Sequence, residues 1–250
     1  MFKNIVHPTF PINLQRRRRK QDGGNKEGFP IPPNLYSLKM GRGLLIAFEG
    51  LDGVGKSTQI DILQSHLKAT IFKFPDRQTK IGQILDLHLK KERILEPKVE
   101  HLLHCANRAE KESAIIENLL NEKTCLLDRY LGSGISYTSS KRAQDFNLEN
   151  KEELIEWAKK GDAHLLEPDL TFYLKTSKPY LKNTNELYET PTFQKAVEKN
   201  FDILSKEKNW TEIQVDSFWK KESELASFLI EKIEIERQKS KDLPLKFNTL

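Results

Sequence analysis

The chain has 250 residues, 37% of them hydrophobic, which is enough to build one sizeable folded core. No apolar run approaches the roughly 18 residues that a membrane-spanning helix requires, so we expect a soluble chain with no membrane partner. Two cysteines, Cys105 and Cys125, exclude a disulfide framework and favour a reducing compartment, while the net charge of +5 raises the question of an anionic partner.

The positive charge is concentrated in residues 1–39, which hold eight Lys or Arg and only two acids. The remaining residues are nearly neutral, so the core gives no reason to expect nucleic-acid binding. The segment also contains five prolines, the pair Gly23-Gly24 and the basic run Arg16–Lys20, with no sustained helical or strand period. We expect a disordered basic extension at 1–39 and a folded domain at 40–250.

Three interpretations of this extension stay open. It is an organelle-targeting peptide, a nuclear-import or anion-binding patch at Gln15–Lys20, or an inert leader before a working start at Met40. The expected location is the cytoplasm, with the nucleus and the mitochondrion as alternatives that depend on the extension.

A phosphate-binding loop follows the apolar run at residues 44–48. The loop is Gly50-Leu51-Asp52-Gly53-Val54-Gly55-Lys56-Ser57-Thr58, and a helical pattern comes directly after it. Strand, glycine-rich turn and helix in this order direct backbone N–H groups and the positive helix end at phosphate oxygens. We expect Lys56 to bridge the terminal phosphates of a nucleoside triphosphate and Ser57 to bind Mg²⁺.

The chain then alternates strand and helix patterns, which is typical of a parallel sheet with helices on both faces. The expected strands are Gly43–Phe48, Thr70–Phe74, Thr124–Leu127, Leu170–Leu174 and Glu212–Val215. The expected helices are 55–68, 79–91, 97–121, 132–145, 151–160, 190–207 and 219–238. The sequence therefore predicts a three-layer α/β/α fold around a five-stranded parallel sheet, with a short lid.

Charged residues follow the predicted strands, where the active sites of parallel sheets lie. Arg77 follows the second strand, Asp128 and Arg129 end the third, and Arg108 lies on the long helix between them. We expect the three arginines to converge beside the phosphate-binding loop and to bind a second, phosphate-bearing substrate, because guanidinium forks bind phosphate bidentately. Asp128 suits a metal-bound water, and the alternative is that it only pairs with Arg129.

The ordered set of motifs from about Arg42 to the C-terminus resembles the thymidylate kinases, particularly their eukaryotic and poxviral branch. The motifs are the phosphate-binding loop, Phe-Pro-Asp-Arg-Gln-Thr at 74–79, Leu-Leu-His-Cys-Ala-Asn-Arg at 102–108, Asp-Arg-Tyr-Leu-Gly-Ser-Gly at 128–134, Glu-Pro-Asp-Leu at 167–170 and Glu-Leu-Tyr-Glu at 186–189. The resemblance implies the reaction of ATP and dTMP to ADP and dTDP, with Mg²⁺ as cofactor, in a homodimer.

The resemblance also implies roles for single residues. It places Asp52 on the sugar 3′-hydroxyl, Arg77 and Arg129 on the acceptor phosphate, Arg108 on the base edge, and Tyr137 where a ribose 2′-hydroxyl would be. It adds further substrate contacts from Phe74, His104, Ser133, Gly134 and Tyr188.

Three departures from the family pattern bear on chemistry. Eukaryotic relatives usually carry an arginine where this chain has Gly53, and other relatives carry one in a lid, yet residues 175–188 contain none. Lys182 lies nearest to the lid arginine position and is the expected catalytic cation beside Lys56 and Arg129, with Lys175 and Lys178 as alternatives. His104 stands where the family has a base-stacking phenylalanine, and its spacing from Arg108 places both on one helix face.

Several functions therefore stay open. The leading hypothesis is a thymidylate kinase, and the alternatives are a weakly active or inactive nucleotide-binding relative and a deoxynucleotide kinase with a different base preference. A deoxynucleoside kinase would leave Arg77 and Arg129 without a phosphate to bind. A GTPase would need an Asn-Lys-x-Asp stretch, which the sequence lacks.

Overall fold

The structure, a computed structural model, describes residues 41–177, 186–218 and 221–248. The expectations for residues 1–39, and for Lys178 and Lys182 in the predicted lid, lie outside these ranges. The strands are β1 (Leu45–Glu49), β2 (Thr70–Lys73), β3 (Cys125–Asp128), β4 (Leu170–Lys175) and β5 (Trp210–Gln214). The helices are α1 (Lys56–Leu67), α2 (Lys80–Leu89), α3 (Pro97–Leu120), α4 (Leu131–Ser139), α5 (Lys151–Gly161), α6 (Pro191–Leu204) and α7 (Glu222–Ser240).

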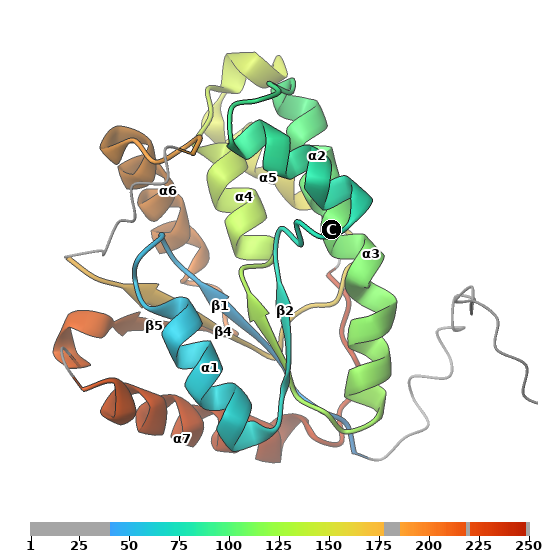
Figure 1. Cartoon of the computed structure of the whole chain (residues 1–250), viewed down its shortest axis with the longest axis vertical. Helices are drawn as coiled ribbons and strands as arrows, with labels where there is room; N and C mark the ends of the chain where they lie inside the picture. The colour runs from blue at the N-terminus through green and yellow to red at the C-terminus, as the bar shows by residue number, and fades with distance from the viewer. Residues whose placement is uncertain (1–40, 178–185, 219–220, 249–250) are drawn as a thin grey trace, which may run out of the picture. The chain divides into compact units, whose positions relative to one another are not determined.

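The strands form one parallel sheet in the order β2-β3-β1-β4-β5 (Figure 1). From β1 the chain passes to the edge strand β2 and returns to β3, which lies between them. It then crosses to β4 and β5 on the other side of β1. The order therefore reverses beside β1, and ligands of parallel sheets bind in the crevice at such a reversal, outside the carboxyl ends of the strands.

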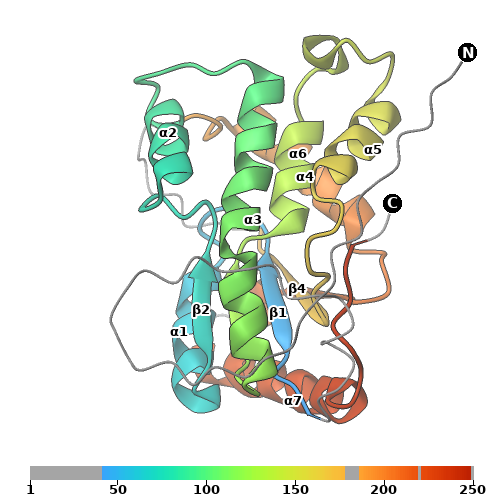
Figure 2. The same ribbon diagram turned by 90° about the vertical axis from the view of Figure 1, so that its right-hand side faces the viewer.

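Successive side chains of the central strands point to opposite faces of the sheet, and both faces are buried. One face packs on α1 and α7 through a cluster that includes Ile46, Phe48, Leu63, Leu126, Phe172, Leu229 and Ile233. The other face packs on α3 through a cluster that includes Leu45, Ala47, Ile115, Leu119, Cys125 and Leu127. Figure 2 shows α3 in front of the sheet. The predicted three-layer α/β/α class is confirmed.

Most predicted elements match to within a few residues, and the predicted helix at 132–145 is the main error. In the structure α4 ends at Ser139, and a separate 3₁₀ turn covers Ala143–Phe146. Ser140 lies at the helix end and its hydroxyl donates to the Ser136 carbonyl, a bond that competes with helix continuation. No helix in the described ranges is both long and apolar enough to cross a membrane.

A buried ion pair fixes the entry of the chain into β1. The Arg42 guanidinium donates to both carboxylate oxygens of Asp169 at 2.7 and 2.6 Å, and the side chains are 4% and 5% exposed. Asp169 also accepts the Leu45 backbone N–H at 2.9 Å. The pair therefore ties the start of β1 to the residue before β4, its neighbour in the sheet.

We expect Arg42→Met to lower the free energy of unfolding by about 3–5 kcal/mol, because the substitution leaves the Asp169 carboxylate buried without its partner. Urea unfolding followed by circular dichroism measures the change. The matched control is Arg142→Met, whose exposed pair with Asp145 should contribute at most about 1 kcal/mol. Equal effects of the two substitutions would contradict a special role for the buried pair.

Candidate active site

The phosphate-binding loop joins β1 to α1 and is shaped by glycines with positive φ. Gly50, Gly53 and Gly55 have φ values of 134°, 74° and 93°, a backbone region that L side chains rarely adopt. A Cβ on Gly50 would lie 2.4 Å from the carbonyl oxygen of Leu174, so the loop closes tightly on β4. Because no side chain caps α1, the N–H groups of its first turn are free for an anion.

The Lys56 ammonium lies inside this loop. It donates to the carbonyl oxygens of Gly50 at 3.0 Å and Leu51 at 2.6 Å. Burial lowers the pKa of Lys56 to about 7, and the nearby charge of Arg129 also lowers it, against the attraction of Asp52. Phosphate oxygens at the loop would supply the negative charge that this buried ammonium lacks.

Ser57 and Asp128 supply oxygen atoms at one point of the loop. The Ser57 hydroxyl donates to Oδ2 of Asp128 at 3.2 Å, and the same oxygen lies 3.4 Å from Nζ of Lys73. The sequence left open that Asp128 only pairs with Arg129, but Arg129 pairs with Asp52 instead. A hydroxyl and a carboxylate beside a phosphate site fit Mg²⁺, which keeps waters and takes few protein ligands.

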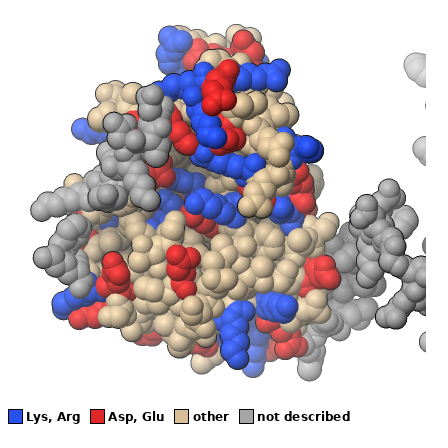
Figure 3. Space-filling model, viewed as in Figure 1, with Lys and Arg blue, Asp and Glu red and all other residues tan. Residues whose placement is uncertain are grey.

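The loop opens into a cleft of about 570 Å³ at the carboxyl ends of the strands. Figure 3 shows Lys and Arg side chains crossing the middle of this face of the molecule. The cleft is lined by sequence-predicted residues, namely Asp52, Gly53, Gly55, Lys56, Ser57, Thr58, Phe74, Arg77, His104, Arg108, Asp128, Arg129, Ser133, Gly134, Tyr137 and Tyr188. Val54 instead packs in the core beside α1. Gly50 packs against Leu174 of β4, and the Leu51 carbonyl accepts a hydrogen bond from Lys56.

Arg129 joins the loop to the wall of the cleft. Its guanidinium donates to Asp52 at 2.6 Å, to the Gly50 carbonyl at 3.1 Å and to Ser133 Oγ at 3.1 Å. The charge of Arg129 holds the pKa of Asp52 below its usual value. An acceptor phosphate placed here would meet a guanidinium that is already oriented.

Tyr137, a residue of α4, lies next to the Arg129 side chain. The Arg129 guanidinium carbon is 5.4 Å from the centre of the Tyr137 ring, and the ring is edge-on to Tyr188. The Tyr137 hydroxyl is buried, and burial raises its pKa, against the opposing effect of Arg129. Its role in sugar discrimination stays a prediction, with the ring placed in the cleft wall as that role requires.

Arg77 is held by carboxylates rather than free for phosphate. It donates to Glu186 at 2.7 and 2.9 Å and to Asp86 at 2.8 Å. Glu186 directly follows the part of the predicted lid that lies outside the described ranges. An acceptor phosphate must therefore share Arg77 with Glu186 or displace it.

Arg108 is the most deeply held of the three arginines. Its guanidinium is 3% exposed and makes three hydrogen bonds of 2.7–2.9 Å to the fully buried Asp162. A Cβ on Gly134 would lie 2.7 Å from the Arg108 guanidinium, so only a glycine fits there without displacing it. Arg108 still lines the cleft, and its position is fixed by Asp162, the residue that directly follows α5.

His104 lines the cleft beside Arg108, as the helical spacing predicts. Burial lowers the pKa of His104 to about 3, and Arg108 acts in the same direction against Glu100, so the imidazole is neutral at pH 7. A neutral imidazole can donate and accept a hydrogen bond, which a phenylalanine at this position could not do.

Glu100 is the centre of a polar network behind His104. It accepts from Lys141 at 2.6 Å and from the Tyr188 hydroxyl at 2.8 Å, and lies 3.2 Å from His88 Nε2. Burial raises the pKa of Glu100, but the bonds from His88 and Lys141 outweigh it and lower the value to about 2. The network fixes Tyr188, which has φ 76° and follows the lid segment, against α3.

Of the lysines expected to replace the missing arginine, Lys175 is described and points elsewhere. Its ammonium lies 2.6 Å from Asp202 and 3.5 Å from Glu212, and it is not part of the cleft lining. Lys178 and Lys182 fall outside the described residues. The catalytic role of Lys182 therefore stays a prediction.

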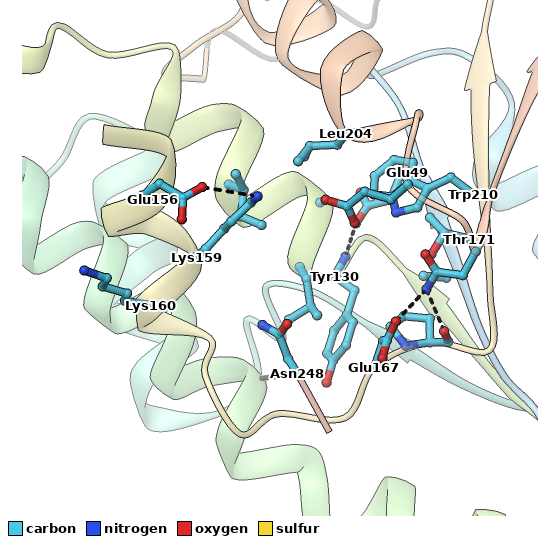
Figure 4. A pocket seen from close by; sticks show the side chains of 17 residues that line it. Glu49, Tyr130, Glu156, Lys159, Lys160, Glu167, Thr171, Leu204, Trp210 and Asn248 are labelled. Carbon is cyan, nitrogen blue, oxygen red and sulfur yellow. Dashed lines mark hydrogen bonds and ion pairs between the residues drawn. The ribbon is translucent and has the colours of Figure 1, made fainter. Parts of the chain in front are cut away.

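A second cavity of about 380 Å³ lies between α4, α5 and the β4 and β5 side of the sheet. Figure 4 shows Glu49 and Trp210 on one side of it and the Glu156–Lys159 ion pair on the other. Tyr130 lines both cavities, but this one contains no residue of the loop from Gly50 to Thr58. It is therefore not the phosphate site.

Glu49, Glu100 and Lys73 are among the residues that sequence reasoning missed. Glu49 is fully buried and accepts from Tyr130 N, Ser133 N and Ser133 Oγ at 2.6–3.0 Å, and Glu100 and Lys73 lie in the cleft lining. A glutamate that ends a buried apolar strand, as Glu49 does, is the one signal that was available. Nothing local to Glu100 or Lys73 reveals their partners, which are 41 and 55 residues away in the chain.

We expect Glu100→Gln to lower the free energy of unfolding by roughly 3 kcal/mol at pH 7, because it leaves Lys141 buried without a counter-charge. A carboxyl whose folded pKa is depressed stabilises the fold above its unfolded pKa, and this contribution is lost as pH falls toward the folded pKa. The difference between variant and wild type should therefore shrink as pH falls from about 4.5 toward 2. Glu117→Gln, an exposed substitution on the same helix, is the control. A difference that does not change with pH in urea unfolding would contradict the depressed pKa.

Comparisons with known proteins identify the family of the chain. A family model described as thymidylate kinase matches residues 48–222. The chain is 41% identical over 179 residues to the thymidylate kinase of Schizosaccharomyces pombe, covering 68% of this chain and 80% of that one. It is 35% identical over 180 residues to the human thymidylate kinase, covering 68% and 81%.

Among solved structures, a thymidylate kinase from Candida albicans superposes with a TM-score of 0.73 and 32% sequence identity. The match covers 84% of this chain and 100% of the Candida chain. Sequence, fold and the loop-centred cleft agree, and the chain belongs to the thymidylate kinase family.

Proposed function

We propose that the chain transfers the γ-phosphoryl group of ATP to dTMP and so forms ADP and dTDP. The observation that carries this proposal is one cleft that holds both a phosphate-binding loop and a second set of cations. Lys56 and Ser57 lie at the loop end, and Arg77 and Arg129 line the same space. Two phosphate-bearing substrates can therefore meet with their phosphates between these groups.

The donor half acts by binding and charge neutralisation. Loop N–H groups and Lys56 would hold the β- and γ-phosphates, which fixes the phosphorus for attack. Ser57 and Asp128 would hold Mg²⁺, which would supply positive charge to neutralise the donor phosphates. The 3.2 Å contact between Ser57 Oγ and Asp128 Oδ2 supports this assignment, since both oxygens already face one point.

The acceptor half aligns the attacking phosphate. Arg129 is oriented by Ser133 and the loop, and it is the better placed of the two arginines to hold a phosphate beside the donor. Arg77 would bind the phosphate in place of Glu186, and the segment that begins at Glu186 would lose this ion pair. Asp52 at the mouth of the loop is 62% exposed at its side chain and free to accept from a sugar hydroxyl.

Base preference depends on His104. The family relation supports dTMP as acceptor. A neutral imidazole at position 104, in place of the family's phenylalanine, can form hydrogen bonds to the base of the acceptor that a phenyl ring cannot form. The Candida albicans relative is described as having a broad substrate specificity. We therefore propose dTMP as the first acceptor to test and a panel of nucleoside monophosphates beside it.

We expect ADP release by the full chain with ATP, Mg²⁺ and dTMP, and a loss of at least about 10³-fold in kcat for Lys56→Met, because the loop cation contacts the transferred group. The assay compares dTMP, other deoxynucleoside and ribonucleoside monophosphates, and thymidine. Unchanged circular dichroism and melting temperature of the variant serve as the control for folding.

Two results would overturn the proposal. Turnover with thymidine and not with dTMP would make the chain a nucleoside kinase. Binding of ATP and dTMP without turnover would make it an inactive nucleotide-binding relative, the alternative that Gly53 in the loop favours.

We further propose that the chain forms a homodimer through α2 and the start of α3, the face seen in Figure 2. Apolar side chains there are exposed, with Ile94 at 69%, Leu102 at 53% and Val99 at 46%. Val99 and Leu102 are three residues apart on one helix and so share a face. A second copy of the chain would cover this surface.

Leu102→Asp should convert a dimer to a monomer, because the exposed leucine would become a charge inside the interface. Sedimentation at micromolar concentration measures the mass. The control is Leu243→Asp, an exposed leucine after α7. A monomeric wild type, or a dimeric Leu102→Asp chain, would contradict this interface.

A further inference from the structure

Among the described residues, six lysines and arginines line the cleft, and their contacts differ in strength. Arg77, Arg108, Arg129 and Lys141 each donate to a carboxylate at 2.9 Å or less, and Lys56 donates to two loop carbonyls. Lys73 differs, because its one ion pair within the described ranges is the 3.4 Å contact to Asp128, and its side chain is 68% exposed. Lys73 therefore has the weakest polar contacts of these six cations.

Sheet geometry fixes where Lys73 stands. It is the last residue of β2, and the parallel register pairs it with Asp128 at the end of β3. Paired residues on neighbouring strands project to the same side of the sheet, so the two side chains lie together at the carboxyl edge. Asp128 is in turn paired with Phe48 of β1, the strand that enters the loop.

Asp128 connects Lys73 to the reacting end of the donor site. The oxygen that faces Lys73 Nζ also accepts from the Ser57 hydroxyl, the group next to the loop lysine. The charge of Lys73 also reaches Asp52 at the loop mouth, where it helps to lower the pKa of that carboxyl. The ammonium thus lies beside the donor loop, on the β2 side of the cleft that Arg77 and Arg129 also line.

We propose that Lys73 is a catalytic residue that contacts the transferred phosphoryl group and neutralises charge on it in the transition state. This inference rests on the proposed function. An oxygen of the acceptor phosphate dianion attacks the γ-phosphorus of ATP and forms the new P–O bond. The bond to the β–γ bridging oxygen breaks, its electron pair stays on ADP, and Lys73 keeps its proton throughout.

Lys73 can exchange Asp128 for a phosphoryl oxygen at a small cost in free energy, because its pairing with Asp128 is weak. A partly exposed ion pair at 3.4 Å is weak, whereas a charge-assisted hydrogen bond to a phosphoryl oxygen is among the stronger polar contacts. Mg²⁺ at Ser57 and Asp128 would further weaken the hold of Asp128 on the ammonium. Lys73 would then exchange one oxygen partner for a stronger one.

Steady-state kinetics of the full chain with ATP and dTMP test the proposal. Lys73→Ala should lower kcat by roughly tenfold or more and leave both KM values within about twofold, and Lys73→Arg should keep most of kcat. Lys123→Ala, an exposed lysine at the opposite end of β3 with the same charge change, should match the wild type.

A binding measurement separates a catalytic role from a structural one. Calorimetry with ADP and aluminium fluoride, which imitate the transferred group, should show dTMP binding roughly tenfold weaker to Lys73→Ala than to the wild type. With ADP alone, the two proteins should bind dTMP equally. A uniform loss of affinity in both experiments would show that Lys73 only shapes the ground-state site, which overturns the proposal.

The remaining outcomes are distinguishable. An active wild type with unchanged kcat in Lys73→Ala, and a reduced kcat in Lys182→Ala, would overturn this inference and transfer the role to Lys182. A wild type without turnover on any monophosphate would overturn the proposed function, and this inference with it.

Discussion

The buried carboxylate of Glu49 connects the donor half of the cleft to the acceptor half. Glu49 is the last residue of β1, and its oxygens accept two backbone N–H groups and the hydroxyl of Ser133 at the start of α4. Burial raises its pKa, against the opposing effects of Ser133 and Arg129. Since Arg129 in turn donates to Ser133 and Asp52, the phosphate loop and the acceptor residues keep one relative position.

Three cations of the cleft are paired with carboxylates of the protein. The guanidinium groups of Arg77 and Arg129 are each held by carboxylates, and Lys141 is held by Glu100. This pairing avoids the cost of several unpaired cations in a partly buried space. A substrate phosphate must then offer more than a carboxylate does, and a dianion with three oxygens meets that condition.

Sequence alone predicts the parts of this site that depend on local pattern. The loop from Gly50 to Thr58 follows from its glycines, and the cations at the strand ends follow from the rule that parallel strands share one active edge. Arg108 lies in the cleft as predicted, but its tight pairing with Asp162, 54 residues away, could not be read from its helix. The same limit hides Glu100 and Lys73, whose importance comes from partners that only the folded chain brings near.

Local pattern also fails where competing bonds decide. The residues from 132 to 145 have a helical period, yet α4 stops at Ser139, and Lys141 beyond its end reaches Glu100 on α3. If α4 continued past Ser139, Lys141 would be part of the helix and its side chain would lie elsewhere. The early end of α4 therefore goes together with the Lys141–Glu100 ion pair, which local sequence does not reveal.

The position of Lys56 links nucleotide binding to proton uptake. Burial lowers the pKa of this side chain to about 7, so its protonation depends on the charges around it. Phosphate oxygens stabilise the charged form, so a bound triphosphate raises that pKa and draws a proton from the solvent. Affinity for the nucleotide should consequently weaken above neutral pH, and the heat of binding should vary with the ionisation enthalpy of the buffer.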